Sequence, residues 1–161
     1  MYEEIKNEIL QEYYQKNYPN DGQRFIAWYL RKIFNLDPYE TNDCITDGAG
    51  DKQIDAVYID NRLQKIFILQ GKFYSGKIDS EPLREVLSSW IMINKLDDLQ
   101  NAANSKLKVK INEISNALED DYEVCFELVT TGELTEAAQK DLENYQKILV
   151  TSLYLANIPM I

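Results

Sequence analysis

Three polar residues that could bind a cation or a phosphate lie on two neighbouring strand-like segments. The segment 53–60 carries Asp55, and the segment 65–73 carries Gln70 and Lys72 near its end. Both segments are rich in β-branched and aromatic residues and are joined by a turn-like sequence, which predicts a hairpin. Because side chains alternate along a strand, Gln70 and Lys72 share a face that is expected to meet Asp55. Burying these polar groups costs free energy, and a hard cation bound through oxygen would offset that cost.

A purely structural explanation competes with a binding site. Asp55 and Lys72 could form a cross-strand ion pair on a solvated face of the hairpin. Apolar residues populate both faces of the two segments, however, so the hairpin is expected to be covered on both sides. A buried pair is weak evidence for stability and better evidence for a functional site.

The stretch from Asp47 to Lys72 resembles the active-site hairpin of the PD-(D/E)xK nuclease superfamily. In that superfamily two strands carry the active-site residues. The first strand has an Asp, and the next has an acid or Gln two residues before a Lys. Together these residues hold a divalent metal ion and activate water. Ile54-Asp55 and Gln70-Gly71-Lys72 correspond to the two halves. With the Gly-rich acidic loop that precedes them, they are most similar to Mrr-type restriction endonucleases, and closer still to the N-terminal domain of abortive-infection phage-resistance (AIPR) proteins. The rest of the chain matches only in the order of its elements.

The resemblance implies a fold and a role for each motif residue. The fold is an α+β domain with a restriction-endonuclease-like αβββαβ core, a mixed sheet of about four strands flanked by helices. Asp55, the amide oxygen of Gln70 and the carbonyl of Gly71 would bind Mg²⁺ or Mn²⁺. Lys72 would orient the attacking water and stabilise negative charge on the phosphate.

Further ligands would come from the acidic loop and from the helix before the motif. Asp51 would either hold a second metal ion or form turn hydrogen bonds, whereas Asp47 is interpreted as a turn residue. Mrr-type enzymes usually carry a Glu on the preceding helix, just after an aromatic residue, but here Phe25 is followed by Ile26. Gln23 is the nearest polar candidate on that helix, so catalysis is expected to be weak or to need an activator.

Two functions from different classes therefore remain open. The first is a metal-dependent endonuclease that cleaves DNA in phage defence, with RNA as another possible substrate. The second is a catalytically degenerate nuclease-like domain that serves as a nucleic-acid-sensing or protein-interaction module. A formal net charge of −10, from 17 basic and 27 acidic residues, favours the second because a polyanion is poorly attracted to such a surface. Against this, Lys65, Lys72, Lys77 and Arg84 are expected to supply positive charge near the site.

Composition narrows the chemistry further. The 161 residues contain no His, which excludes Ser-His-Asp hydrolases, His-ligated zinc sites and HNH-type nucleases. Cys44 and Cys125 show no metal or redox spacing and are predicted to be buried thiols in a reducing compartment. The first residues do not form a signal peptide, so a cytoplasmic protein is expected.

Hydrophobic periodicity predicts the other elements. We expect amphipathic helices at 2–17, at 22–35 with Asp21 as cap, from Ser80 through Ile91, at 107–118, and after Thr135, with an edge strand within 39–46 and a strand at 122–131. In the second helix Phe25, Trp28, Tyr29, Ile33 and Phe34 should form a core stripe.

The chain is expected to be one domain, 1–161, at the N-terminal end of a longer protein. Its last segment, 148–161, is uncharged and mostly apolar but too short to span a bilayer, so no membrane partner is expected. It is predicted to be either a packed terminal element or a surface that contacts the rest of a longer chain or a second copy.

Overall fold

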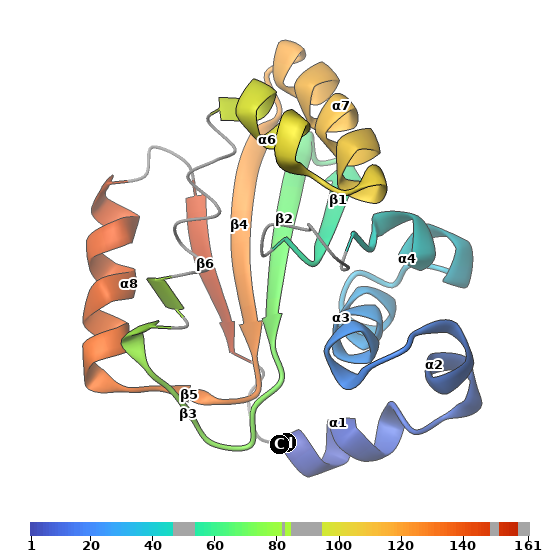
Figure 1. Cartoon of the computed structure of the whole chain (residues 1–161), viewed down its shortest axis with the longest axis vertical. Helices are drawn as coiled ribbons and strands as arrows, with labels where there is room; N and C mark the ends of the chain where they lie inside the picture. The colour runs from blue at the N-terminus through green and yellow to red at the C-terminus, as the bar shows by residue number, and fades with distance from the viewer. Residues whose placement is uncertain (47–53, 82, 85–94, 149–151, 158–161) are drawn as a thin grey trace.

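A mixed β-sheet forms the centre of the computed structural model, which describes residues 1–46, 54–81, 83–84, 95–148 and 152–157. Its four strands in these residues lie in the order β1 (Ala56–Asp60), β2 (Lys65–Lys72), β4 (Glu123–Thr130) and β6 (Ser152–Asn157) (Figure 1). The β1–β2 pair is antiparallel, whereas β2–β4 and β4–β6 are parallel. A separate small sheet pairs β3 (Lys77–Ile78) with β5 (Glu133–Leu134).

Helices cover both faces of the sheet. One face packs against α1 (Tyr2–Glu8), α2 (Glu12–Asn17), α3 (Asp21–Lys32) and α4 (Pro38–Cys44). The other packs against α7 (Ser105–Glu119) and α8 (Glu136–Ile148), with α6 (Leu96–Ala102) beside α7 (Figure 1). The chain is therefore a mixed α/β domain of the α+β kind, in agreement with the predicted fold class at this level.

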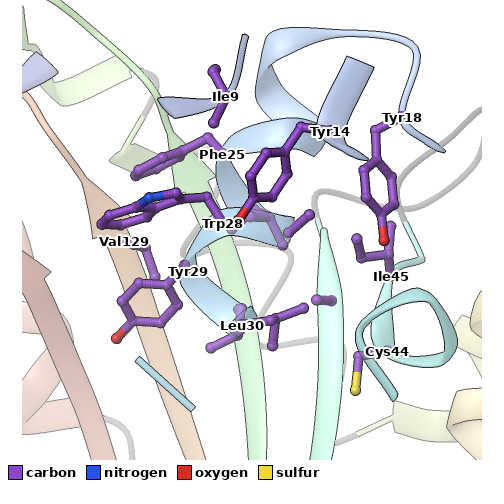
Figure 2. Packing of buried hydrophobic residues seen from close by; sticks show 14 of the residues in the cluster. Ile9, Tyr14, Tyr18, Phe25, Trp28, Tyr29, Leu30, Cys44, Ile45 and Val129 are labelled. Atoms are coloured by element: carbon purple, nitrogen blue, oxygen red, sulfur yellow. The ribbon is translucent and has the colours of Figure 1, made fainter. Parts of the chain in front are cut away.

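Side chains alternate between the two helical layers along β2. Ile66 and Ile68 join the hydrophobic cluster with α7 and α8, whereas Leu69 joins the cluster with α3. Figure 2 shows the α3 layer, in which Phe25, Trp28 and Leu30 gather over the sheet. This two-sided burial confirms that the hairpin is covered on both faces.

The first predicted helix, 2–17, is wrong as a single element. The chain forms α1 and α2, and turn-type hydrogen bonds from Leu10 N–H to Asn7 and from Gln11 N–H to Glu8 interrupt the helix between them. The break changes which tyrosine is buried: Tyr14 enters the core, whereas a continuous helix would have placed Tyr13 there.

The predicted edge strand within 39–46 is largely wrong, because Pro38–Cys44 form α4, although Ile45 makes an isolated antiparallel bridge to Ala56. The Asp37 carboxylate accepts from the Glu40 N–H at 2.8 Å, and the Glu40 carboxylate accepts from the Asp37 N–H at 3.2 Å. This capping box, with Pro38 in the first turn, stabilises a helix start strongly enough to override the strand propensity of the segment.

α3 forms close to its prediction, with two local corrections. Its cap is Asn20, whose side chain accepts from Gln23 N–H at 2.9 Å, instead of the predicted Asp21. The helix ends at Lys32, so Ile33 lies beyond it and is exposed instead of extending the core stripe.

Three more of the predicted elements are present in the structure. Strand β4 and helices α7 and α8 form near the expected positions, and Thr135 Oγ1 accepts from Ala138 N–H at the start of α8. The predicted helix from Ser80 to Ile91 lies largely outside the described residues. Both cysteines are buried and free, and burial raises the pKa of the Cys44 thiol to about 12.

The terminal segment contributes a strand to the sheet. Residues 152–157 form β6, which pairs with β4 through its whole length. This supports a packed terminal element, whereas a contact with more chain or with a second copy stays a prediction. Within the described residues, no helix is long and apolar enough to cross a membrane.

Candidate functional site

A β-bulge positions Asp55 at the start of β1. The sheet register pairs Ala56 with Leu69, yet the Asp55 N–H also donates to the Leu69 carbonyl, with the two atoms 2.9 Å apart. Two consecutive residues thus oppose one, which is the hydrogen-bond pattern of a bulge. The packing agrees, since Ile54 belongs to the α7–α8 cluster whereas Ala56 belongs to the α3 cluster. Simple alternation therefore does not set the direction of the Asp55 side chain.

A hydrogen bond to the motif on β2 sets that direction instead. Asp55 Oδ2 accepts from the Gly71 N–H at 2.7 Å, so the carboxylate lies beside the peptide bond that joins Gln70 to Gly71. Asp55 is buried, with 9% of its surface exposed. The backbone donor therefore fixes where the carboxylate lies at the end of the hairpin.

Gly71 is required by the close approach of α3 to β2. A Cβ at this position would lie 2.7 Å from Ile26 Cδ1 and 2.8 Å from Ile26 Cγ1, well inside contact distance. The absence of a side chain lets α3 pack directly on the strand that carries the motif. The Gly of Gln70-Gly71-Lys72 thus links the core to the position of the polar residues on either side.

Gln70 is the polar side chain that the fold leaves least satisfied. It is buried, with 4% of its surface exposed, and its amide oxygen Oε1 has no hydrogen-bond partner among the residues that the structure describes. Alternation from Ile66 and Ile68 places it on the α7–α8 face of β2. An unsatisfied buried carbonyl costs about 1–3 kcal/mol, which a bound ligand would offset.

Lys72 ends β2 and is partly exposed. Its backbone is fixed by Thr130, whose hydroxyl donates to the Lys72 carbonyl at 2.8 Å and accepts from the Gly132 N–H at 2.9 Å. Thr130 is fully buried at the matching end of β4. The strand end that carries the lysine is therefore anchored, while its ammonium can reach solvent.

The donor set fits a hard cation only in part. Asp55 and Gln70 offer the oxygen types that Mg²⁺ and Mn²⁺ prefer, and a carboxylate can accept a hydrogen bond while it binds a metal ion. Within the described residues, however, no three Cys, Asp or Glu side chains group as metal ligands would. Asp47 and Asp51 lie in 47–53, outside the described residues.

The structure connects the other predicted residues less directly to the motif. Gln23 is partly buried in the first turn of α3, one helical turn before Ile26, which contacts Gly71.

Lys65 is at the far end of β2 from Lys72, roughly 23 Å away at about 3.3 Å per residue. The Lys65 ammonium nitrogen lies 3.9 Å from a carboxylate oxygen of Glu123. Arg84 Nε forms an ion pair with Asp141 Oδ2 at 2.9 Å. The expectation that Lys65 adds charge near the site is therefore wrong.

A further buried carboxylate on the sheet, Glu127, was not among the residues predicted from the sequence. Glu127 on β4 is 8% exposed, opposes Leu69 in the register, and accepts from the Tyr29 hydroxyl at 3.1 Å. Burial raises the pKa of Glu127, while the Tyr29 hydrogen bond opposes that shift. An acid inside the apolar run Cys125–Val129 was the available signal, because acids are rarely buried in such a run without a partner.

The candidate site thus consists of a bulge-positioned carboxylate, an unsatisfied amide oxygen and an anchored lysine at one end of β2. Comparison of the chain with protein-family models, with curated proteins and with solved structures finds no match.

Proposed function

We propose that Asp55, Gln70 and Lys72 form a divalent-cation-dependent site that hydrolyses phosphodiester bonds in nucleic acid, with DNA as the first substrate to test. The observation that carries this proposal is the buried Gln70 Oε1, which has no partner in the described part of the chain and is adjacent to the peptide that binds Asp55. A core that needed only packing would gain free energy from an apolar residue at this position.

Each residue would contribute through a property that the fold already gives it. Asp55 and Gln70 would hold Mg²⁺ or Mn²⁺, which when bound polarises a phosphate oxygen and acidifies a water molecule. The hydrogen bond from the Gly71 N–H would hold the Asp55 carboxylate in position for that role. The Lys72 ammonium would stabilise charge that builds on the phosphate, from a backbone held in place by Thr130. The role in phage defence that the AIPR resemblance implies is part of this proposal.

A cleavage assay with matched variants tests the proposal. Plasmid DNA, single-stranded DNA and RNA are incubated with the protein and Mg²⁺ or Mn²⁺, for the parent, Lys72→Ala and Lys16→Ala. Lys16 is an exposed lysine on α2, outside the motif, so its variant is the control for loss of one positive charge. We expect Lys72→Ala to lower the cleavage rate by about 100-fold or more without lowering stability, and Lys16→Ala to cleave like the parent. Equal rates for all three proteins would contradict the proposal.

A second function has its own support. The net charge of −10, the Gln in place of an acid, and the use of Arg84 in an ion pair all favour a catalytically degenerate domain that senses nucleic acid or binds protein. A parent protein that binds nucleic acid or a partner, but cleaves no substrate with either metal ion, would favour this second function.

A further inference from the structure

A cavity of about 350 Å³ lies where α2 meets the C-terminal end of α3, away from the motif on β2. Its polar lining consists of Gln11, Tyr13, Tyr14, Arg31, Lys32 and Asn35. Two of these residues are cationic, and the side chains of the other four are neutral and can donate hydrogen bonds.

The charge of this lining is opposite to that of the whole chain. The net charge is −10, yet among the described residues no carboxylate lines this cavity. Glu8, whose charge acts on Tyr14, already accepts a hydrogen bond from the Trp28 indole N–H. The cavity is thus a local concentration of positive charge and of hydrogen-bond donors, which is the composition that an anion requires.

Arg31 is held in place before any ligand arrives. Its Nη1 donates to the Leu36 carbonyl at 3.0 Å, and its Cζ lies 5.2 Å from the centre of the Tyr13 ring. Asn35 adopts a left-handed conformation, φ 57°, which ends α3 and turns the chain so that Leu36 can accept from Arg31. The Leu36 carbonyl and the Tyr14 hydroxyl engage part of the guanidinium, which has five N–H donors. A guanidinium that is already held in place loses less entropy when it binds an oxyanion.

We propose that this cavity binds a phosphate group, with the guanidinium of Arg31 as the fork-shaped donor and the ammonium of Lys32 as the second positive charge. Arginine matches the geometry of a phosphate because two parallel N–H groups can reach two of its oxygens. The phosphate would belong either to a small molecule, such as inorganic phosphate or a mononucleotide, or to a nucleic-acid backbone. This binding needs neither a metal ion nor the residues Asp55, Gln70 and Lys72.

The test is a metal-free titration followed by two-dimensional NMR of the whole chain. Inorganic phosphate is added at constant ionic strength, with chloride as the balancing anion, and the side-chain signals of Arg31, Asn35 and Gln11 are recorded. The variants are Arg31→Lys, which keeps the charge and removes the fork, and Lys32→Gln. The control is Lys16→Gln, an exposed lysine on α2 that does not line the cavity.

We expect saturable shifts of these signals in the parent, roughly tenfold weaker binding in Arg31→Lys, weaker binding in Lys32→Gln, and unchanged binding in Lys16→Gln. Because Lys32 is exposed, its variant should fold even if Arg31→Lys does not. Shifts that follow ionic strength alone, or that weaken equally in Lys16→Gln, would overturn the proposal. A mononucleotide and a single-stranded oligonucleotide then distinguish the two sources, since the correct one should compete with phosphate at the lower concentration. The titration contains no metal ion, so its failure would leave the cleavage proposal standing.

Discussion

Replacing Gly71 by Ala tests how tightly the motif is tied to the core. The added Cβ would lie 2.7 and 2.8 Å from two carbons of Ile26, which is itself 1% exposed and has little room to move. Overpacking of this kind costs about 1–3 kcal/mol, and the lower chain entropy of Ala in the unfolded state returns about 0.4–1 kcal/mol. We therefore expect Gly71→Ala to lower the free energy of unfolding by about 1–2 kcal/mol. In a chain of this length, that loss lowers the unfolding midpoint by about 2–8 °C.

A double-mutant cycle with Ile26→Ala separates this contact from other effects. Ile26→Ala alone should cost about 2–5 kcal/mol, because it leaves a cavity where the isoleucine was. The added methyl of Gly71→Ala should enter that cavity, so the double variant should be more stable than the sum of the two losses predicts, by about 1–2 kcal/mol. Urea unfolding of the four proteins gives the coupling energy directly. Losses that simply add, or a Gly71→Ala variant as stable as the parent, would refute the close packing of α3 on β2.

Three other predictions test the layers around the site. Burial raises the pKa of Glu127, so the stability that this residue contributes is full below its unfolded pKa and is lost as pH rises through its folded pKa. Glu127→Gln should therefore gain stability over the parent as pH rises from about 4.5 to 8. A difference in the free energy of urea unfolding that stays constant with pH would contradict this. Asn104→Ala should lower the free energy of unfolding by about 1–2 kcal/mol, because the Asn104 side chain accepts from the Leu107 N–H as the cap of α7 and also donates to the Thr46 carbonyl. Asn116→Ala, on the exposed face of α7, should be nearly neutral, and equal losses of stability in the two variants would count against the cap. Asp55→Ala should lower the free energy of unfolding by about 1–3 kcal/mol in metal-free buffer, because it leaves the Gly71 N–H without its acceptor. A variant that unfolds thermally at the same temperature as the parent would contradict the hydrogen bond.

Local signals account for most of the fold. The β-branched runs of β1 and β2 predicted the hairpin, and the periodic apolar residues at 107–118 predicted the helix that is found as α7. At α4 the β-forming residues of 39–46 predicted a strand, but the Asp37–Glu40 capping signal in the same sequence favours a helix. The break between α1 and α2 carries no Gly or Pro, so only packing against the core could reveal it.

The candidate site shows a different limit of sequence reasoning. The residue types at 55, 70 and 72 suggested a site, but a strict alternation of side chains assumed a regular β1. The bulge at Asp55 depends on how Leu69 is shared by two neighbours, which no local pattern specifies. The partnership of Tyr29 with Glu127 joins residues 98 positions apart, so only the folded chain brings it about.

The most direct test of the metal site is a titration of the isotope-labelled protein with Mn²⁺, a paramagnetic ion that broadens the NMR signals of nearby nuclei. If Asp55 and Gln70 bind a divalent cation, substoichiometric Mn²⁺ should broaden the Gln70 side-chain amide and the Gly71 N–H first. Asp55→Asn and Gln70→Leu should weaken that broadening, and excess Mg²⁺ should reverse it in the parent. Broadening that starts at the exposed acidic residues 119–121, while the Gln70 and Gly71 signals stay sharp, would contradict a cation site at the end of β2.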